Sequence, residues 1–595
     1  MPAILKRQPC VDQQLTLRAG RVRFPKHRRI AMAFDLVVRN GMIVDGSGLP
    51  RYRADIGVKD GKIAEIGRIN GAAAKETMDA DGRVVSPGFV DGHTHMDAQI
   101  FWDPIGTSSC FQGVTTVLMG NCGFTLAPCR EAEADLVMRN LERAEDISRA
   151  AMKAGIKWRW ETFPEFLDVL ESLPKGINYA GYMGHCALRT YVMGQRAFTD
   201  KATEDDLRTM VHHTRESIAA GAHGFSTTRS VSHMTSDDKP VASRLATWEE
   251  FETLVKAMGG GMVEVAGEPR GDAEKARRWY EDLARLAIES GRPITFGLFN
   301  RRAVPGHWRT TFDIIERTAR QGGRMFAQVH SRALNVLLSF ETQLPFDKWD
   351  MWRDMRQLPL AEQKKWLLDA DKRRQLVEIA SRPYEGPIVR GAEARPPEWD
   401  AVFALTDMKG PHKSMAELAR QKNTHPVDLM IDMALERDLK FFMIQPIANE
   451  DQAEALELMK HPRSVVTFSD SGAHVSQIMD SSLQTHLLSH WVREKQAFTL
   501  EEAVKLITND TATQFGFHDR GLLREGMAAD IVVFDPDTVG PRMPEVVCDL
   551  PAGAKRLKQK CDGMHATIVN GQVLLRDNEP TGNLPGRLLR KKARN

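Results

Sequence analysis

From Phe34 onward, the chain alternates short apolar runs with glycine turns and longer amphipathic stretches. In the middle of the chain, residues 205–221 and 275–291 repeat their apolar positions with helical spacing, and strand-like runs flank them. Apolar strands that alternate with helices are typical of an α/β fold with a parallel sheet. The eight strands expected there lie at 84–95, 113–124, 178–188, 221–228, 262–268, 293–299, 324–331 and 464–472. Eight such units predict a (β/α)8 TIM-like barrel within residues 85–519.

The two ends of the chain share a second pattern, in which short β-rich runs are joined by tight turns. Asn40-Gly41 and Asp60-Gly61 lie between such runs near the N-terminus, and Asn570-Gly571 does so near the C-terminus. Asn-Gly and Asp-Gly pairs favour two-residue hairpin turns because both residues accept positive φ. We therefore expect residues 33–84 and 520–590 to form one small composite β-sandwich domain from both chain ends.

Two segments fall outside these patterns. Residues 336–438 are rich in tryptophan, charge and proline, and we interpret them as an insertion, because the middle of the chain exceeds the ~250 residues typical of a barrel. The apolar run at 440–446 is expected to form an extra element after this insertion. Residues 1–32 form a basic extension that we expect to be disordered, with eight Lys or Arg but only one acidic residue before Met32.

Composition narrows the function classes without selecting one. Of the 595 residues, 42% are hydrophobic and 27% are charged, which excludes wholesale disorder. The 81 basic and 79 acidic side chains nearly cancel, so the whole protein has no strong positive charge that would attract nucleic acid. No apolar run is long enough to span a bilayer. Seven scattered cysteines favour a reducing compartment, so we expect a cytoplasmic protein. A homo-oligomer is compatible with this composition.

The strongest chemical signal is His93-Thr94-His95, at the end of the first expected barrel strand. Side chains alternate along a strand, so both imidazoles are expected on one face, within reach of one zinc-type ion. Cys122 follows the second strand, and Asp470 closes the last one. A carboxylate there can bind the ion and also take a proton from a water whose pKa the ion lowers. Because barrel active sites lie at the carboxyl ends of strands, we expect these residues to meet there.

The order of these motifs resembles the D-aminoacylase, or N-acyl-D-amino-acid deacylase, branch of the amidohydrolase superfamily. The matching segments are SPGFVDGHTHMD, GNCG, GHxxLR, FSD, REGMAADIVVFDP and TGNLPGRLLR, within residues 33–590. The resemblance implies a (β/α)8 barrel with a zinc site and a composite β domain. It also implies that His93, His95 and Asp470 bind the metal, with Cys122 as a bridging ligand.

The chain departs from the family pattern after three strands. After the fifth and sixth strands, where the family has its other two zinc-binding histidines, this chain has Glu268 and Leu298. Glu268 offers an oxygen ligand, whereas Leu298 cannot bind a metal, so we expect one ion and leave a second open. His330 and Arg332 replace a tyrosine-rich stretch at the seventh strand. We expect Arg332 and Arg270 to bind substrate, and His330 to supply a ligand, an acid or a substrate contact.

These observations predict a metal-dependent hydrolase of a linear amide C–N bond in a small molecule, with one or two zinc ions. Asp470 is expected to act as general base and acid, and His185, after the third strand, as an oxyanion donor. One alternative is a hydrolase of a cyclic amide or another carboxamide, because the family's carboxylate-binding arginine is not found after Asp470. Another is a metal-poor binding protein that keeps the fold without catalysis, because of Glu268 and Leu298.

Overall fold

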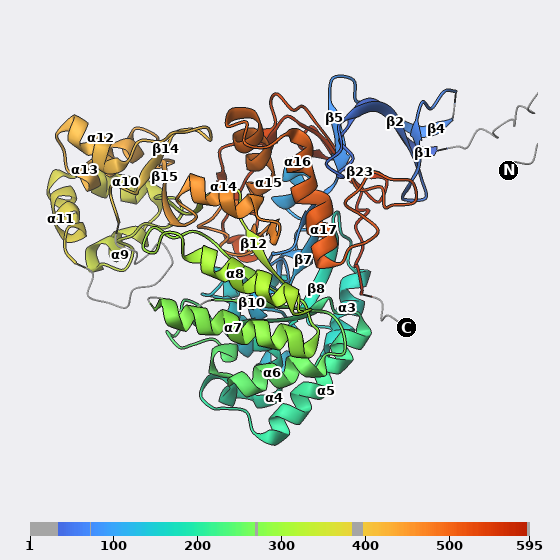
Figure 1. Ribbon diagram of the computed structural model, residues 1–595. Helices are drawn as coiled ribbons and strands as arrows, with labels where there is room; N and C mark the ends of the chain where they lie inside the picture. The colour runs from blue at the N-terminus through green and yellow to red at the C-terminus, as the bar shows by residue number, and fades with distance from the viewer. Residues whose placement is uncertain (1–33, 72, 268–271, 384–396, 592–595) are drawn as a thin grey trace, which may run out of the picture.

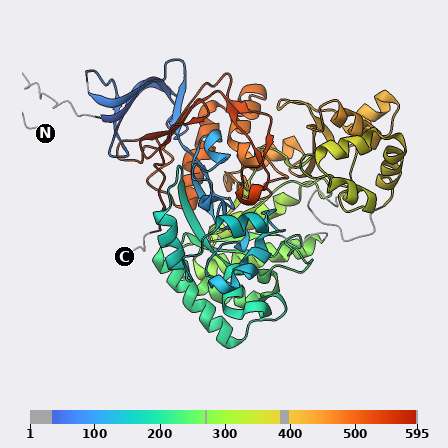
Figure 2. The same ribbon diagram turned by 180° about the vertical axis from the view of Figure 1, so that it is seen from behind.

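A computed structural model describes residues 34–71, 73–267, 272–383 and 397–591. These residues form a barrel, a β domain on one side of it and an inserted α/β unit on the opposite side (Figure 1, Figure 2). The basic extension predicted at residues 1–32 lies outside the described residues.

The barrel is built on a sheet of eight strands, in which each strand pairs in parallel with the next one along the chain. The strands are β6 (Phe89–Asp91), β7 (Val114–Met119), β8 (Asn178–Gly184), β9 (Gly224–Thr228), β10 (Met262–Ala266), β11 (Ile294–Gly297), β12 (Met325–Val329) and β16 (Ser464–Val466). Nearly all of their residues are buried, as expected where helices cover one face and lumen side chains fill the other. Each expected strand overlaps an observed one, so the predicted TIM-like barrel is confirmed.

Helices on the outer face of the barrel connect its strands (Figure 1). They are α3 (Phe163–Ser172), α5 (Glu204–Ala220), α6 (Trp248–Ala257), α7 (Ala273–Ser290), α8 (His307–Arg320) and α14 (Gln452–Lys460). Thr203 and Asp206 form a capping box at the start of α5, and Gly221 ends this helix in the left-handed conformation. The side chain of Asp272 caps the start of α7 by accepting the backbone N–H groups of Glu274 and Lys275. Within the described ranges, each helix is too short or too polar to cross a membrane.

The first and last barrel strands meet just beyond their carboxyl ends. Thr94 and Ser471 form a parallel bridge, and the N–H of His95 donates to the Ser471 carbonyl at 2.8 Å. The Asp91 carboxylate accepts the hydroxyl of Thr467 at 2.7 Å. Since β6 and β16 are only three residues long, these contacts bring the two following loops together over the mouth of the barrel.

The β domain is a nine-stranded sheet that joins strands from both ends of the chain. Its strands are β1 (Phe34–Ile43), β2 (Tyr52–Lys59), β3 (Lys62–Gly67), β4 (Ala74–Asp79), β5 (Val84–Pro87), β17 (Ile531–Phe534), β22 (Met564–Val569), β23 (Gln572–Arg576) and β24 (Glu579–Pro580). The pairing of β5 with β17 links the two ends. Val58 and Ile531, from the two halves, pack in one core. The composite β domain is thus confirmed, with its strands hydrogen-bonded as one sheet.

Two of the three predicted hairpin turns are confirmed. Asp60-Gly61 joins β2 to β3, and Asn570-Gly571 joins β22 to β23, with positive φ at all four residues. The hairpin expected at Asn40-Gly41 is wrong, because β1 continues through both residues. Asn40, with a φ of 61°, forms a bulge against β2, and its amide donates to Asp79 at 2.9 Å. A left-handed Asn therefore serves a bulge here and not a turn.

The inserted unit lies between β12 and β16 in the sequence and has its own core. Its antiparallel sheet has the order β13 (Leu334–Leu338), β15 (Phe442–Ala448), β14 (Phe403–Leu405). Its helices are α9 (Asp350–Arg356), α10 (Leu360–Leu368), α11 (Ala370–Ala380), α12 (Met415–Lys422) and α13 (Pro426–Leu435). Trp352 is fully buried in this core. The run at 440–446, expected as an element after the insertion, instead belongs to β15, the central strand of this unit.

Shorter elements complete the chain. In the long connection between β7 and β8, a turn at 142–146 separates α1 (Ala134–Leu141) from α2 (Arg149–Gly155). Helix α4 (His185–Met193) begins directly after β8. The others are α15 (Leu483–His486), α16 (Leu500–Lys505), α17 (Thr511–Phe515), β18 (Gly540–Pro541), β19 (Glu545–Val547), β20 (Arg556–Lys558) and β21 (Cys561–Asp562).

Candidate metal centre

Four side chains with metal-binding atoms converge at the mouth of the barrel. His93 and His95 follow β6, Cys122 lies in a short turn after β7, and Asp470 follows β16. Gly92 allows the first loop to pass close to its neighbours, since a Cβ there would lie 2.2 Å from the ring of Phe515. The structure therefore brings together residues that the sequence places at three different strand ends.

The separations of these atoms fit a zinc-type ion. Nε2 of His93 lies 3.3 Å from Oδ1 of Asp470 and 3.5 Å from Sγ of Cys122, and Nε2 of His95 lies 3.4 Å from the same Asp470 oxygen. The ligands of a tetrahedral zinc ion, with bonds of about 2.0–2.3 Å, are about 3.3–3.6 Å apart. Among the described residues, Oδ1 of Asp470 has no hydrogen-bond partner, as expected of an oxygen that faces an ion.

Two of the four residues have strained backbones. Cys122 has a φ of 56° and Asp470 a φ of 53°, and such conformations cost about 1–3 kcal/mol each in residues other than glycine. Hydrogen bonds hold both in place: the N–H of Cys122 donates to Oε2 of Glu264 at 2.6 Å, and the N–H of Asp470 donates to the carbonyl of His93 at 3.2 Å. Strain imposed by the surrounding structure is typical of a functional site.

The charges of the site act strongly on one another. Burial would raise the pKa of Asp470, but the imidazoles of His93 and His95 outweigh it and hold this pKa well below its usual range. Burial would lower the pKa of His93, but the carboxylates of Asp470 and Glu264 outweigh it and raise this pKa. Burial raises the pKa of the Cys122 thiol, and the nearby carboxylates add to the rise. The site thus holds an excess of acidic groups that a divalent cation would offset.

Glu264, in the middle of β10, is a residue of the site that the sequence prediction missed. Its side chain is fully buried, and burial raises its pKa to about 7. One carboxylate oxygen accepts the N–H of Cys122, and the other has no partner among the described residues. The available signal was a charged residue inside the apolar run MVEVA.

Glu145 and His474 are two more residues that the prediction missed. Glu145 lies in the turn between α1 and α2, and His474 lies four residues after Asp470. Oε2 of Glu145 is 3.7 Å from Nε2 of His95 and 3.7 Å from Nε2 of His474. Glu145 carries no motif that marks it in the sequence, whereas the position of His474 in the segment SDSGAH was a usable signal.

The oxyanion role predicted for His185 is wrong, because both of its ring nitrogens are already engaged. Nδ1 lies 2.9 Å from the hydroxyl of Thr227, and Nε2 lies 2.9 Å from a carboxylate oxygen of Glu250. Glu250 also accepts from Arg189 at 2.6 Å, and all of these side chains are buried. His185 therefore ties α4 to β9 and α6 and leaves no free nitrogen for a substrate.

Arg332 and His330 follow β12 and are both buried. Nη1 of Arg332 donates to the hydroxyl of Ser482 at 2.8 Å, and its Nε lies 3.7 Å from Oδ1 of Asp480. Nδ1 of His330 lies 3.1 Å from both the N–H and the carbonyl oxygen of Arg332. Burial and the Arg332 charge lower the pKa of His330 to about 3. The ring is therefore neutral at neutral pH, and its predicted roles as a ligand, an acid or a substrate contact stay predictions.

Three other positions from the sequence prediction have separate outcomes. Glu268 and Arg270 lie outside the described residues, so their predicted roles stay predictions. Leu298 follows β11, is 1% exposed and packs in the barrel core, so it contributes no donor atom to the centre.

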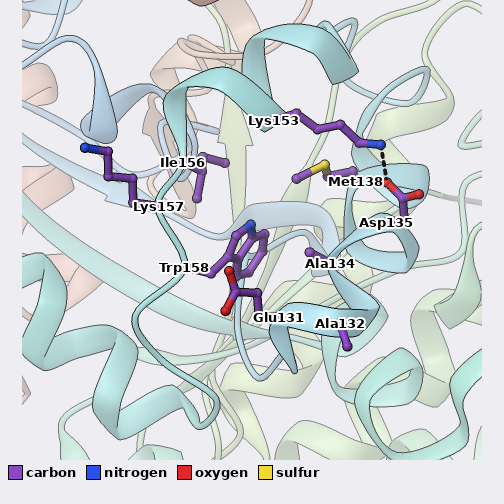
Figure 3. A pocket seen from close by; sticks show the side chains of 9 residues that line it. All are labelled: Glu131, Ala132, Ala134, Asp135, Met138, Lys153, Ile156, Lys157 and Trp158. Atoms are coloured by element: carbon purple, nitrogen blue, oxygen red, sulfur yellow. Dashed lines mark ion pairs between the residues drawn. The ribbon is translucent and has the colours of Figure 1, made fainter.

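A pocket of about 500 Å³ lies beside α1 and α2 (Figure 3). It is lined by Glu131, Ala132, Ala134, Asp135, Met138, Lys153, Ile156, Lys157 and Trp158. Its ion pair, between Lys153 and Asp135 at 2.9 Å, is more than half exposed. Because this lining includes none of the metal-type residues described above, we do not assign the chemistry to this pocket.

Comparison with known proteins finds two matching family models and several similar deacylases. A model of the amidohydrolase family matches residues 76–575, and a model of the urease alpha-subunit N-terminal domain matches residues 13–88. The chain is similar to D-aminoacylase of Alcaligenes xylosoxydans xylosoxydans, with 29% identity over 575 residues that cover 94% of this chain and 98% of the relative. It is also similar to N-acyl-D-glutamate deacylase of the same organism, with 27% identity over 94% of this chain and 97% of the relative.

A solved structure shares the fold. N-acyl-D-glutamate deacylase from Bordetella bronchiseptica, complexed with zinc and a phosphonate inhibitor that mimics the tetrahedral intermediate, matches with a TM-score of 0.62. The match covers 94% of this chain and 100% of that chain at 24% identity. At this identity the match supports the fold, barrel and β domain together.

Proposed function

Because the chain belongs to the amidohydrolase family, we propose that it is a metal-dependent hydrolase of a linear amide C–N bond in a small molecule. The observation that carries the proposal is the convergence of His93, His95 and Asp470 at 3.3–3.4 Å over the barrel mouth. The relatives named D-aminoacylase and N-acyl-D-glutamate deacylase support an N-acyl amino acid as the substrate class.

Zinc is the ion that this donor set favours. Nε2 of His93, Nε2 of His95 and Oδ1 of Asp470 would hold it, with Sγ of Cys122 as a further ligand. Imidazole, thiolate and carboxylate are the usual zinc ligands in proteins. When bound, such an ion lowers the pKa of water toward ~7 and polarises a carbonyl oxygen.

Asp470 is the proposed general base and acid. Its pKa is held well below the usual range, so the carboxylate is ionised at neutral pH and can accept a proton from the attacking water. After the attack, the same carboxyl group can return this proton to the amide nitrogen, which leaves as an amine. The hydrogen bond from the Asp470 N–H to the His93 carbonyl keeps the carboxylate aimed at the centre during both transfers.

Arg332 and His330 are the proposed substrate-binding residues. The guanidinium of Arg332 can bind a carboxylate through two parallel N–H groups, and its burial strengthens that contact. Nε2 of His330 has no hydrogen-bond partner among the described residues, so it can form a hydrogen bond with the substrate. Both residues follow β12, at the same end of the barrel as Asp470.

Other features of the protein stay proposals. We propose a cytoplasmic location and one firmly bound zinc ion, and we leave a homo-oligomer as a prediction. The roles of Glu268 in metal binding and of Arg270 in substrate binding also stay predictions.

The Asp470→Asn variant tests the proposal. We expect kcat on N-acetyl-D-amino acids to fall by about 10²–10⁴-fold while the zinc content stays, because the amide retains an oxygen but cannot take a proton. Asp562→Asn is the matched control, since this exposed carboxylate pairs with Arg542 beside the separate two-stranded sheet of β18 and β21. A turnover equal to that of the unmodified protein in Asp470→Asn would overturn the mechanism. Failure of the unmodified zinc-loaded protein to cleave any N-acyl amino acid would overturn the substrate class.

A further inference from the structure

Helix α5, on the outer face of the barrel, carries two adjacent histidines and a glutamate one turn further on (Figure 1). The three residues are His212, His213 and Glu216. Residues three or four positions apart are neighbours on the surface of a helix, so the carboxylate can meet both imidazoles. One ligand atom from each of these side chains lies within 4.8 Å of the other two. The helix therefore gathers three metal-binding groups at a place remote from the strand ends.

The two imidazoles on α5 have nearly the same relative arrangement as the pair in the metal centre. The ring centroids of His212 and His213 lie 5.2 Å apart, with an angle of 70° between the ring planes. Those of His93 and His95 lie 5.4 Å apart, with an angle of 67°. Two histidines on one tetrahedral zinc ion, with bonds of about 2.0–2.1 Å, have ring centroids about 5 Å apart. The rings on α5 are thus spaced to share one ion.

The ring of His213 is held in position before an ion arrives. Its Nδ1 lies 3.2 Å from Oε2 of Glu216, and the ring packs edge-on against Tyr191 of α4, with 5.1 Å between the centroids. Tyr191 is fixed in turn, because its hydroxyl donates to Glu161 at 2.8 Å and the guanidinium of Arg130 lies 4.2 Å over its ring. A ligand that is already ordered loses less side-chain entropy when it binds.

The other two ligands are open to solvent. His212 is exposed, and the Glu216 side chain is 39% exposed, against 16% for His213. Exposed side chains change rotamer within nanoseconds, so His212 can close the remaining gap to the about 3.3–3.6 Å expected between zinc ligands. The neighbouring cation, Arg215, donates to the carbonyl of Ala257 at 3.3 Å, so its charge is engaged elsewhere. An ion can therefore reach the group directly from solution.

We propose that His212, His213 and Glu216 form a surface site for a divalent transition-metal ion such as zinc. Imidazole nitrogen favours zinc, copper and nickel over magnesium and calcium, and a carboxylate completes a common zinc ligand set. Three protein ligands leave a coordination position for water, which the exposure of the site supplies. The site shares no residue with the centre at the barrel mouth, so the inference does not depend on the proposed function.

An ion at this surface site would stabilise the fold without taking part in the reaction. Its three ligands converge only while α5 is helical, so the ion binds the folded chain in preference to the unfolded one. A ligand of the folded state stabilises it by RT ln(1 + [L]/Kd), where [L] is the free ligand concentration. The thermal unfolding midpoint should therefore keep rising with zinc concentration after the centre has been filled.

Isothermal titration calorimetry of the full chain with zinc tests the proposal. We expect the unmodified protein to bind one more zinc ion than either His212→Gln or Glu216→Gln. Before zinc is added, His212→Gln should unfold at the same temperature as the unmodified protein, because its side chain is exposed. His565→Gln is the matched control, since it removes a histidine that pairs with the carboxylate of Asp577 at 2.6 Å in the β domain. This control should bind as many ions as the unmodified protein.

A second measurement locates the ion without any substitution. Crystals of the unmodified protein soaked in zinc should show an anomalous peak about 2.0–2.2 Å from ligand atoms of His212, His213 and Glu216. The absence of a peak there would overturn the surface site. Equal numbers of bound zinc ions in the unmodified protein, His212→Gln and Glu216→Gln would overturn it as well.

Discussion

Oε1 of Gln328 lies 2.7 Å from Nδ1 of His93. The amide of Gln328 is oriented by its Nε2, which donates to the hydroxyl of Thr295 at 3.2 Å, so its oxygen faces the imidazole. His93 therefore donates from Nδ1 and keeps the lone pair of Nε2 for an ion. A hydrogen bond on the far nitrogen of a ligating histidine fixes the ring and raises its basicity.

Replacing Gln328 with Leu should weaken zinc binding by about 10–100-fold, because His93 loses the group that orients it. Competition against a chelating zinc indicator measures this change. Gln328→Glu keeps an acceptor at the same place and should bind zinc at least as tightly as the unmodified protein. Equal affinity in the Leu variant would show that this hydrogen bond does not prepare His93.

Glu264 should control whether Cys122 reaches the metal. In Glu264→Leu, the buried N–H of Cys122 loses its acceptor at a cost of about 1–3 kcal/mol, and its strained backbone is free to relax. We expect the thiolate-to-metal absorption of the cobalt-substituted protein to disappear while cobalt stays bound to His93 and His95. Glu264→Gln retains an oxygen acceptor and should retain the absorption. Loss of the band in both variants would mean that the negative charge matters, not the hydrogen bond.

Asp480 should make binding of a carboxylate substrate depend on pH. Burial raises the pKa of Asp480 to about 7, although the Arg332 guanidinium opposes the rise. Below this pH, Asp480 is neutral and Arg332 is available to a substrate carboxylate; above it, the ionised Asp480 competes. KM for an N-acyl amino acid should therefore rise by about tenfold, or ~1.4 kcal/mol, as the pH passes upward through 7.

The Asp480→Asn variant should abolish this rise in KM, because its side chain stays neutral at every pH. An N-acyl amino acid amide, which lacks the carboxylate, serves as the control substrate and should show no such rise with either protein. Identical pH profiles of KM in the variant and the unmodified protein would argue against Arg332 as the anion-binding residue.

His223 should make the fold sensitive to acid. It donates to the carbonyl of Phe515, and burial lowers its pKa to about 3 from the ordinary 6.5. A histidine with a depressed folded pKa stabilises the fold above its unfolded pKa, and this contribution is lost as the pH falls from 6.5 toward 3. The loss amounts to about 1.4 kcal/mol per pH unit within that window.

In His223→Gln, the thermal unfolding midpoint should fall less steeply between pH 6.5 and 5 than in the unmodified protein. His212→Gln, an exposed substitution on α5, should leave the slope unchanged. A slope in His223→Gln that matches the unmodified protein would place the acid-sensitive group elsewhere.

The barrel could be predicted from the sequence because its strands are short, apolar and separated by amphipathic helices. The hairpin turn at Asp60-Gly61 could also be predicted, since two residues that accept positive φ between β runs commonly form such a turn. Asn40-Gly41 carries the same local signal but forms a bulge inside β1, where pairing with β2, β4 and β5 decides the geometry. Local turn chemistry cannot distinguish these outcomes, because the strands that pair with β1 lie outside the two-residue signal, between Tyr52 and Pro87.

The same limit applies to the metal centre. His93, His95 and Asp470 stand at strand ends in recognisable motifs, so the barrel topology alone predicts that they meet. Glu145 reaches the centre from a turn between two helices, and no spacing rule connects it to His474. His185 has the motif expected of a functional residue, but its partner Glu250 is supplied by a distant helix and occupies the nitrogen that a substrate would need.

The β domain pairs strands that the ribosome makes at the beginning and at the end of translation. Strand β5 ends at Pro87, and its partner β17 begins at Ile531, which the ribosome adds 444 residues later. At 5–20 residues per second, this edge waits about 20–90 s for its neighbour. During that time β1 to β5 present unpaired, apolar strand edges of the kind that recruit other chains. The nascent chain must therefore shield this edge until translation is nearly complete, and a product truncated before Ile531 would keep it exposed permanently.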